Sequence, residues 1–111
     1  MPSRNLENRL RDILDAIAGI QKFTDGLTFE EFQADEKTVK SVLYNMAIIG
    51  EAARHLPPQV EERYPHIPWL DVRGMRNVVV HEYFQVNLQI IWQTIQEDLL
   101  PLAAALQQLL E

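Results

Sequence analysis

Apolar residues recur at steps of three and four along most of the chain, which is the spacing of amphipathic helices. The first stripe begins at Leu6 and stops before Thr24-Asp25-Gly26, so a long helix is predicted there, ending in a turn. Thr28 and Glu31 have the spacing of a capping box and predict a short helix through Phe32. The first stripe consists of Leu6, Leu10, Ile13, Leu14, Ile17 and Ile20.

A second long helix is predicted over residues 36–56, with Asp35 as its N-cap and Pro57-Pro58 as its end. One further turn is predicted in the segment VEERY, before Pro65. The long helix carries two apolar stripes on different sides, which is typical of a helix at the centre of a bundle. They contain Val39, Val42, Leu43, Met46, Ile49, Gly50 and Ala53 on one side, and Tyr44, Ala47 and Ile48 on the other. Gly50 has no side chain, so a neighbouring helix can approach closely there.

The sequence pattern of the second half of the chain predicts two more long helices. Pro68 can serve as the first residue of a helix that runs to Val79, whereas residues 81–86 receive no assignment. Asn87 is a suitable N-cap for the last helix, in which Pro101 should introduce a kink or a break. The apolar residues of the last helix have a heptad-like spacing, which suits packing inside one bundle or an interface between subunits. They are Leu88, Trp92, Ile95, Leu99, Leu102, Leu106 and Leu109.

These patterns together predict an all-α fold, an up-and-down bundle of four main helices plus short helices, in a single domain over residues 1–111. A chain of 111 residues can bury a core without a disulfide or a metal ion. The absence of cysteine excludes disulfides, thiolate metal ligands and thiol nucleophiles. The charged N-terminus does not read as a signal peptide, and the longest nearly apolar run, residues 99–106, is too short for a bilayer. We therefore expect a cytoplasmic protein without a membrane partner.

Charge is distributed unevenly along the chain. The net charge of −6 argues against a protein that coats nucleic acid through its overall field. However, all three histidines and four of the seven arginines lie between residues 54 and 81, where three acidic residues oppose them. If the protein binds a polyanion, we therefore expect this part of the chain to bind it. Arg54, Arg63, His66 and Arg73 are either a basic rim that guides such a ligand or scattered surface charges.

Strong polar residues surround three consecutive valines in the stretch RGMRNVVVHEYF, which begins at Arg73. On an unbroken helix, Arg73, Asn77 and His81 share one face because they are four residues apart. Arg76 and Tyr83, seven residues apart, share another face. Arg76 and His81 would then point about 140° away from each other. Either the helix ends or distorts before His81, or a second chain completes the site.

These residue types suit a phosphodiester ligand. An imidazole can accept or donate a proton near neutral pH, and a guanidinium can hold phosphate oxygens and stabilise added charge. The alternative is that the histidine is a helix cap or an exposed side chain and that the arginines pair with carboxylates. Glu51 and His55, four residues apart, could share a metal ion, but two ligands do not make a metal motif. We therefore expect no metal and no cofactor.

The spacing of Arg76, His81 and Tyr83 is R-x4-H-x-Y, which resembles the signature of the HepT-like toxins, a branch of the HEPN superfamily of helical ribonucleases. The likeness covers most of the chain and includes IIGEAARHLP, IPWLDVRGMRNVVVHEYFQV and IIWQTIQEDLLPL. The resemblance implies a homodimer in which two motifs share a cleft and cleave RNA without a metal ion. It also implies a type VII-like toxin–antitoxin pair, in which a nucleotidyltransferase antitoxin of the MNT type transfers AMP to the motif tyrosine.

The resemblance assigns a role to each motif position. Arg76 would hold the scissile phosphate, His81 would act as acid and base, and Tyr83 would accept AMP. Asn77 matches the polar residue that often follows the motif arginine, and it would orient the substrate or the histidine.

Glu51 and the two tryptophans have expected roles in the surroundings of this motif. Glu51 lies near the second apolar stripe of the central helix, so we expect it to be at least partly buried. A buried carboxylate needs a partner, here Arg76 or Arg73, and we expect an orienting role rather than direct catalysis. Trp69 and Trp92 are expected to be core aromatic residues.

Two other functions remain open at this stage. The helical fold also resembles the substrate-binding domains that accompany nucleotidyltransferases, in which case the chain is a non-catalytic partner and Tyr83 is chiefly a modification acceptor. A purely structural dimer that uses the apolar seam of residues 88–109 is a third possibility, but it leaves the polar residues around the valines unexplained.

Overall fold

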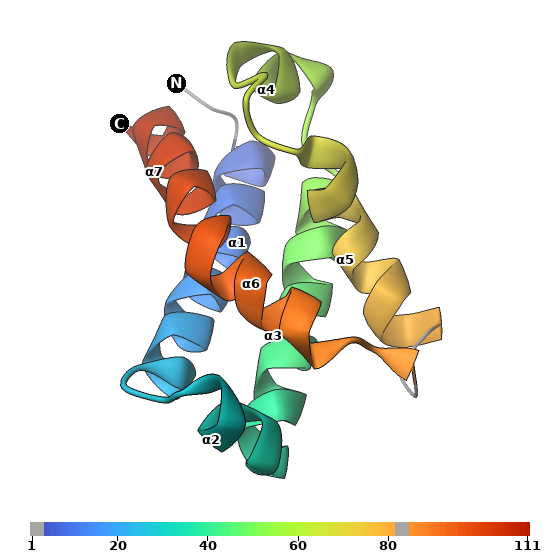
Figure 1. The fold of residues 1–111 in the computed structure, drawn as a ribbon. Helices are drawn as coiled ribbons and strands as arrows, with labels where there is room; N and C mark the ends of the chain where they lie inside the picture. The colour runs from blue at the N-terminus through green and yellow to red at the C-terminus, as the bar shows by residue number, and fades with distance from the viewer. Residues whose placement is uncertain (1–3, 82–84) are drawn as a thin grey trace.

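The computed structural model describes residues 4–81 and 85–111, with the side chains of residues 5–77 and 85–111 (Figure 1). This part of the chain forms seven helices and contains no strand, which confirms the predicted all-α fold. The helices are α1 Arg4–Thr24, α2 Phe29–Ala34, α3 Glu36–Ala53, α4 Pro58–Arg63, α5 Trp69–His81, α6 Leu88–Glu97 and α7 Leu99–Leu110. None of them is long and apolar enough to cross a bilayer.

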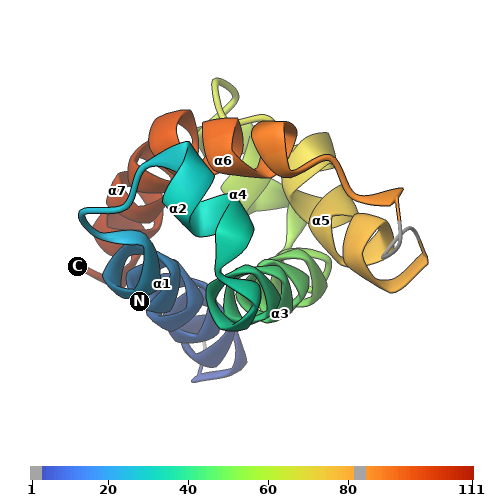
Figure 2. The ribbon, with the colours of Figure 1, turned by 60° about the horizontal axis from the view of Figure 1, so that its bottom comes forward.

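The helix α3 lies between α1 and α5, and the first of its two predicted apolar stripes is buried in the core. It packs most extensively against α5 on one side and α1 on the other. Figure 2 shows these three helices side by side in one layer, with α6 and α7 passing across them on the same face. The short helices α2 and α4 lie at opposite ends of the bundle (Figure 1). α5 therefore contacts the rest of the bundle mainly through α3.

The core is formed by the apolar stripes that the sequence contains. Ile95, Leu99, Leu102 and Leu106 are each at most 2% exposed, so the seam of the last two helices packs inside the bundle. This observation decides between the two interpretations of the seam, since buried side chains are not available to another subunit. The core includes Leu10, Ile13, Ile17, Ile20, Val42, Leu43, Met46 and Ile49 from the two longest helices.

The predicted helix signals before α3 are confirmed at atomic detail. Gly26 has a φ of 77°, a left-handed conformation that glycine adopts without strain, and it lies in the turn after α1. Thr28 accepts a hydrogen bond from the amide of Glu31, and the Glu31 carboxylate accepts one from the amide of Thr28, which completes the capping box. The Asp35 carboxylate accepts a hydrogen bond from the amide of Thr38 and caps α3.

Two helix boundaries differ from the sequence prediction because of proline. α3 ends at Ala53, three residues before the predicted end at 56. The carbonyl groups of Ala53 and Arg54 would need the N–H groups of Pro57 and Pro58, which proline lacks. α5 begins at Trp69 rather than Pro68, and the Pro68 carbonyl accepts the hydrogen bond from the amide of Val72.

The break expected at Pro101 is present, and it lies three residues earlier. α6 ends at Glu97 and α7 begins at Leu99, with Asp98 between them. Pro101 has no N–H to donate to the carbonyl of Glu97, so the helical ladder is interrupted where that bond would form. Asn87 caps α6 as predicted, since its side-chain oxygen accepts hydrogen bonds from the amides of Gln89 and Ile90.

Both tryptophans pack as core aromatic residues. Trp69 is 6% exposed, and its indole N–H donates a 2.9 Å hydrogen bond to the carbonyl of Tyr64. Trp92 is half-buried, and its ring lies 5.1 Å from that of Phe32 and 6.2 Å from that of Phe29, measured between centroids. These contacts fix the start of α5 against the end of α4 and the middle of α6 against α2.

Candidate active site

α3 and α5 approach each other very closely at Gly50. A Cβ atom at this position would be 2.5 Å from the amide nitrogen of Arg76, 3.1 Å from its Cβ and 3.2 Å from the carbonyl oxygen of Arg73. No real side chain fits at such distances, so the close contact depends on glycine. The expectation that Gly50 lets a neighbouring helix approach is confirmed. The contact brings the first carbons of the Arg76 side chain directly beside α3.

Arg76 forms an ion pair with the residue that follows this glycine. Its Nε atom lies 2.9 Å from Oε2 of Glu51, and Oε1 of Glu51 lies 3.4 Å from Nε2 of His55. The carboxylate thus uses one oxygen for each partner. The pairing of Glu51 with an arginine is confirmed, and of the two candidates the partner is Arg76. Since α3 and α5 both contribute, the guanidinium is held by two packed helices.

Glu51 is more exposed than expected. In this chain, 48% of its side chain remains accessible, and 37% of the Arg76 side chain does. The reason is that the described chain covers the second apolar stripe of α3 only in part. Tyr44, which belongs to this stripe, is 69% exposed, while Ala47 and Ile48 are half-buried. The sequence identified this stripe correctly as apolar, but the prediction that its surroundings bury Glu51 was wrong.

Arg76 and Glu51 line a hollow of about 280 Å³ on the outer side of α1, α3 and α5. The hollow also contains Arg9 from α1 and the exposed ring of Tyr44. Among the described residues, no side chain accepts a hydrogen bond from the two terminal nitrogens of Arg76. These donors are therefore unpaired within the described residues, and α1 contributes one further cation and one further carboxylate to the hollow, Arg9 and Asp12.

Arg9 was not identified from the sequence. It lies on α1, more than sixty residues before the motif, and its charge is one of several on the polar face of that helix. No local pattern distinguishes it from Arg4 or Arg11. Its place beside Arg76 results from the packing of α1 on α3, which the sequence pattern does not specify.

The other predicted site residues are Arg73, Asn77, His81 and Tyr83, and none of them lines this hollow among the described side chains. The guanidinium of Arg73 forms an ion pair with Glu61 of α4, one turn away from Arg76 on α5. Asn77 is exposed and follows Arg76 directly. The side chain of His81 and the whole of Tyr83 lie outside the described residues, so their roles stay predictions.

The helix α5 continues without interruption from Trp69 to His81. The alternative in which the helix ends before His81 is therefore wrong. On a continuous helix, positions 76 and 81 are separated by about 140° around the axis and about 7.5 Å along it.

The residues considered as a basic rim do not surround the hollow. Arg63 stacks its guanidinium on the ring of Tyr64 at 5.7 Å, and His66 packs on the same ring at 6.2 Å. His66 lines a different hollow, between α5 and α7. None of Arg54, Arg63, His66 and Arg73 lines the hollow of Arg76. Scattered surface charges are the better description of these residues.

No group of three or more histidine and acidic side chains that could hold a metal ion is found in the described parts of the chain. The pair of Glu51 and His55, considered as two metal ligands, instead forms a direct contact of 3.4 Å.

Comparison with known proteins identifies the group to which this arrangement belongs. A family model described as "Ribonuclease HepT-like" matches residues 13–109. The chain belongs to the HepT-like ribonuclease family. The match extends over the helices that form the core and over both partners of the Arg76–Glu51 ion pair. No solved structure matches the chain at a significant level.

Relatives of similar length support the same membership. "Probable ribonuclease HepT" of Thermococcus cleftensis is 36% identical over 106 residues, which cover 96% of each protein. "Putative RNase MJ0127" of Methanocaldococcus jannaschii is 38% identical over 95 residues, covering 86% of this HepT-like chain and 78% of the relative. "Putative RNase TTE0752" of Caldanaerobacter subterraneus is 33% identical over 102 residues, covering 92% and 91%. The family and these names support a ribonuclease of the HEPN type.

Proposed function

We propose that this HepT-like chain is a metal-independent endoribonuclease whose active site forms where two copies meet. It acts as a one-domain cytoplasmic toxin, with a nucleotidyltransferase of the MNT type as its antitoxin. The observation that carries the proposal is the position of Arg76, which two packed helices hold beside an open hollow while α5 runs unbroken to His81. Membership in a ribonuclease family supports the choice of RNA as the substrate.

The continuous helix is the argument for a second copy. A phosphate that receives hydrogen bonds from a guanidinium must lie about 3 Å from it, and a proton-transferring imidazole must be equally close to the reacting oxygen. The positions of Arg76 and His81 on α5 are about 140° apart around the helix axis, which makes such convergence within one chain unfavourable. A two-fold axis beside α5 brings Arg76 of one copy to His81 of the other and creates two equal sites.

The surface beside Arg76 is suited to such a contact. Tyr44 is 69% exposed although it belongs to an apolar stripe, and the half-buried Ala47 and Ile48 lie next to it in the same hollow. Large aromatic residues and arginine are enriched where protein surfaces meet. A second copy that covers this stripe would bury Tyr44 and shield the ion pair of Glu51 and Arg76 from solvent.

The chemistry requires only groups of the chain and of the RNA. The terminal nitrogens of Arg76 hold the non-bridging phosphate oxygens and stabilise the negative charge that grows there. His81 accepts the proton of the ribose 2′-hydroxyl, whose oxygen attacks the adjacent phosphorus. The bond to the 5′ oxygen breaks, and that oxygen takes a proton from an imidazolium. The products are a 2′,3′-cyclic phosphate and a free 5′-hydroxyl. Glu51 orients the guanidinium through Nε and leaves its other donors to the phosphate.

Inhibition follows from the position of Tyr83 two residues after His81. The tyrosine oxygen attacks the α-phosphorus of ATP bound to the nucleotidyltransferase, pyrophosphate leaves, and the phenolic proton passes to a base. The attached AMP adds a bulky anion close to the catalytic residues. It therefore blocks the cleft and repels the phosphates of RNA.

The test is cleavage of RNA by the purified protein in the presence of EDTA. We expect wild-type protein to cut, and Arg76→Ala and His81→Ala to lose at least a hundredfold in rate while keeping the wild-type circular dichroism spectrum. The Glu62→Ala variant, changed at an exposed position of α4, serves as a control that cuts normally. If His81→Ala protein cuts as fast as wild type, the assignment of the site is rejected.

The inhibitory modification has a separate test. Incubation with the partner nucleotidyltransferase and ATP should increase the intact mass by one AMP, and Tyr83→Phe protein should gain nothing. A wild-type protein that gains AMP but never cuts RNA would favour the non-catalytic partner module instead.

A further inference from the structure

A second and larger hollow separates α5 from α6. These two helices do not pack closely on each other within the described residues, and about 490 Å³ of open space lies between them. Met46 and Val72 form its floor, and Leu70, Met75 and Ile90 form its apolar walls. This hollow shares no lining residue with the hollow of Arg76. We call it the α5–α6 groove.

The walls of the α5–α6 groove expose large apolar side chains. Leu70 at the start of α5 is 76% exposed, and Ile90 at the start of α6 is 60% exposed. A single exposed leucine needs no explanation, but two large aliphatic side chains that flank one apolar groove are typical of an interaction site. The floor of buried residues makes the groove a preformed feature, since no side chain has to move to open it.

One end of the groove is acidic. Asp71, Glu97 and Asp98 all line it, and it continues past Glu97 and Asp98 into a smaller hollow of about 160 Å³. Burial, together with repulsion from Glu97 and Asp71, raises the pKa of Asp98 above its ordinary value. Neither hollow is lined by a lysine or an arginine among the described residues. The negative charge at this end is therefore not neutralised by any lysine or arginine that lines the two hollows in the described part of the chain.

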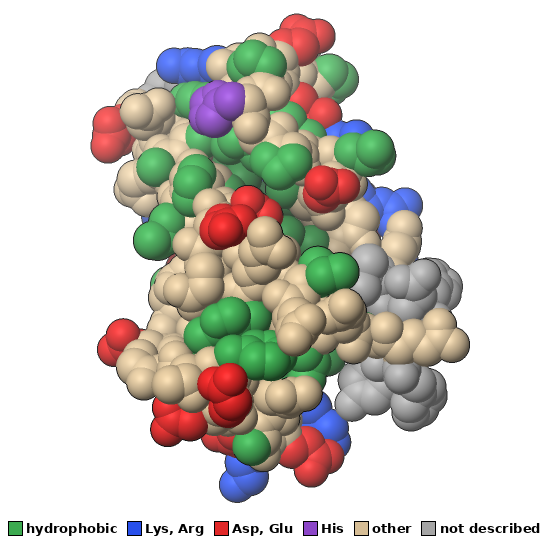
Figure 3. Space-filling view, viewed as in Figure 1, with side chains coloured by type: hydrophobic (Ala, Val, Ile, Leu, Met, Phe, Trp, Pro, Cys, Tyr) green, Lys and Arg blue, Asp and Glu red, His purple; other side chains and the backbone are tan. Residues whose placement is uncertain are grey.

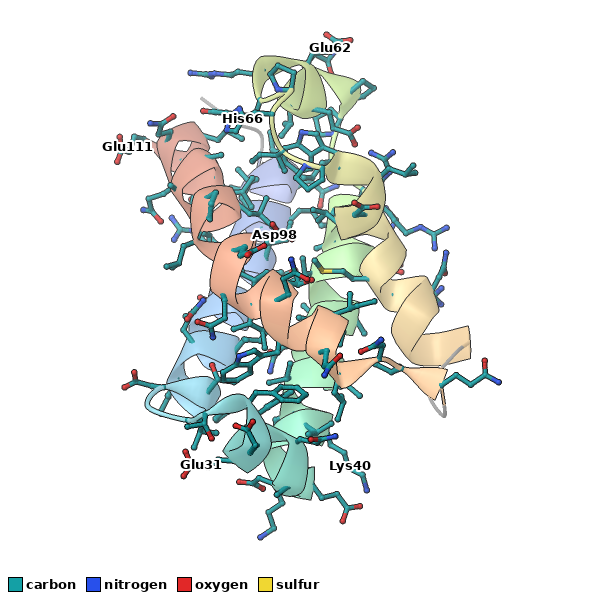
Figure 4. All side chains as sticks on the ribbon, in the orientation of Figure 1. Glu31, Lys40, Glu62, His66, Asp98 and Glu111 are labelled. Carbon is teal, nitrogen blue, oxygen red and sulfur yellow. The ribbon has the colours of Figure 1, made fainter. Side chains whose placement is uncertain are left out.

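Figures 3 and 4 show this face from the same direction. Asp98 lies at its centre, where α6 meets α7 (Figure 4). Acidic and hydrophobic side chains lie next to each other around that point (Figure 3). The combination restricts what can bind, because an occupant must satisfy both the apolar walls and the uncompensated carboxylates.

From this combination we propose that the α5–α6 groove binds a cationic amphipathic helix of a partner protein. RNA is unfavourable there because its phosphates would face three carboxylates, and an anionic membrane surface is unfavourable for the same reason. A second copy that docked groove to groove would place two acidic ends together. An apolar helix face with lysine or arginine beside it complements both parts of the groove. The proposal goes beyond the ribonuclease function and does not depend on it.

The dimensions of the groove set the size of the bound segment. The lining residues extend from Ile90 of α6 to Asp98, its C-cap, which corresponds to about 12 Å along the helix. About two turns of a bound helix fit along this length. Apolar residues at positions i and i+3 or i+4 would contact Leu70 and Ile90, and a basic residue one turn further would reach Asp98.

The test uses a fluorescein-labelled helical peptide of fourteen leucine and lysine residues with a leucine face and a lysine face. Its counterpart, with every lysine replaced by glutamate, is the charge control. Fluorescence anisotropy at moderate salt measures the dissociation constant for each peptide. We expect the lysine peptide to bind wild-type protein with saturation at one site per chain, and the glutamate peptide not to bind.

Matched variants distinguish peptide binding in the groove from binding through the net charge of the protein. Asp71→Lys with Glu97→Lys should weaken binding of the lysine peptide at least tenfold. The control, Glu62→Lys with Glu111→Lys, makes the same change in net charge at exposed positions far from Asp98 (Figure 4) and should weaken it less than threefold. Leu70→Ser with Ile90→Ser should weaken binding at least tenfold, whereas Leu100→Ser, at a 61% exposed position outside the groove, should not.

Each result decides the proposal. Equal weakening by the two charge variants would mean that the peptide binds through net charge alone, and this outcome would overturn the proposal, as would the absence of binding to wild-type protein. RNA cleavage by the groove variants should stay at the wild-type level, so a failure of this proposal is distinguishable from a failure of the ribonuclease assignment.

Discussion

Gly50 of α3 lies directly against Arg76 of α5, so closely that a Cβ atom on Gly50 would be 2.5 Å from the Arg76 amide nitrogen. The next residue of α3, Glu51, pairs with the guanidinium of the same arginine at 2.9 Å. One short contact between two helices therefore determines both where the arginine backbone lies and where its charge points. Stability and function are expected to depend on this contact in separable ways.

Gly50→Ala should destabilise the fold. Overpacking against a helix backbone costs about 1–3 kcal/mol, which exceeds the roughly 0.5–1 kcal/mol that alanine normally gains over glycine in a helix. Gly74 on α5 is the matched control, because a Cβ atom there would meet nothing within 4 Å. Gly74→Ala should stabilise the protein by about 0.5–1 kcal/mol. Urea denaturation measures both, and a Gly50→Ala protein as stable as wild type would contradict the close contact.

Glu51→Gln should reduce turnover more than it reduces stability. The ion pair is half exposed, so its loss should cost less than about 1 kcal/mol of unfolding free energy. Without the carboxylate, Arg76 is less well oriented, and we expect kcat to fall roughly tenfold. KM should stay the same or fall, because a negative charge beside the phosphate site is removed.

The control for Glu51 is the same substitution on the same helix. Glu36, at the start of α3, forms an exposed ion pair with Lys40 at 2.8 Å. Glu51 lies near the other end of α3, so Glu36→Gln should leave kcat unchanged. A Glu51→Gln protein with wild-type kcat would show that the carboxylate does not position the arginine.

Tyr44→Asp should separate the proposed dimer into monomers. The side chain is 69% exposed in one chain, so the change should alter folding stability by no more than about 0.5 kcal/mol. A carboxylate placed in an apolar contact between copies would be desolvated without a partner. Sedimentation velocity measures the mass, and RNA cleavage should be lost with the dimer. Leu100→Asp, at a 61% exposed position on α7, is the control, and equal masses for the two variants would argue against this face.

Asp98→Asn should stabilise the protein at pH 7. Because the pKa of Asp98 is raised in the folded state, its charged form carries a penalty at every pH above that value, and protonation relieves the penalty as the pH falls. The difference between variant and wild type should thus disappear on acidification.

Asp35→Asn should show the opposite pH dependence. Hydrogen bonds from Thr38 hold the pKa of Asp35 below its ordinary value, so the charged form stabilises the fold. The variant should be less stable than wild type at pH 7, and this deficit should vanish in acid. Urea denaturation between pH 7 and pH 3 measures both variants. Identical profiles for the two would contradict the difference in their surroundings.

The elements that the sequence predicts well are those determined by neighbouring residues. The caps at Thr28, Asp35 and Asn87 and the break before Pro101 all depend on groups within four positions. The burial of the last apolar seam also follows from periodicity, because Ile95, Leu99, Leu102 and Leu106 recur at steps of three and four. Local chemistry is sufficient for all of these.

The features that the sequence does not predict depend on packing between distant segments. Periodicity identified the Tyr44 stripe as apolar, but it could not show that the folded chain leaves Tyr44 exposed and covers the rest of the stripe only in part. It also gave no sign that Arg9 of α1 reaches the Arg76 hollow, or that α5 and α6 leave a groove between Leu70 and Ile90. A hydrophobic pattern shows which side of a helix is apolar, and the angle between helices decides what that side contacts.

The most direct test of the central proposal is complementation between two inactive proteins. Arg76→Ala protein keeps His81, and His81→Ala protein keeps Arg76, so a mixed dimer contains one intact site only if arginine and histidine come from different copies. After the two variants are mixed, unfolded together and refolded, we expect RNA cleavage at about a quarter of the wild-type rate, since half of the dimers are mixed and each has one of two sites. A mixture of Arg76→Ala with the double variant Arg76→Ala/His81→Ala should remain inactive. A refolded mixture that forms mixed dimers but recovers no cleavage would contradict an active site shared between two chains.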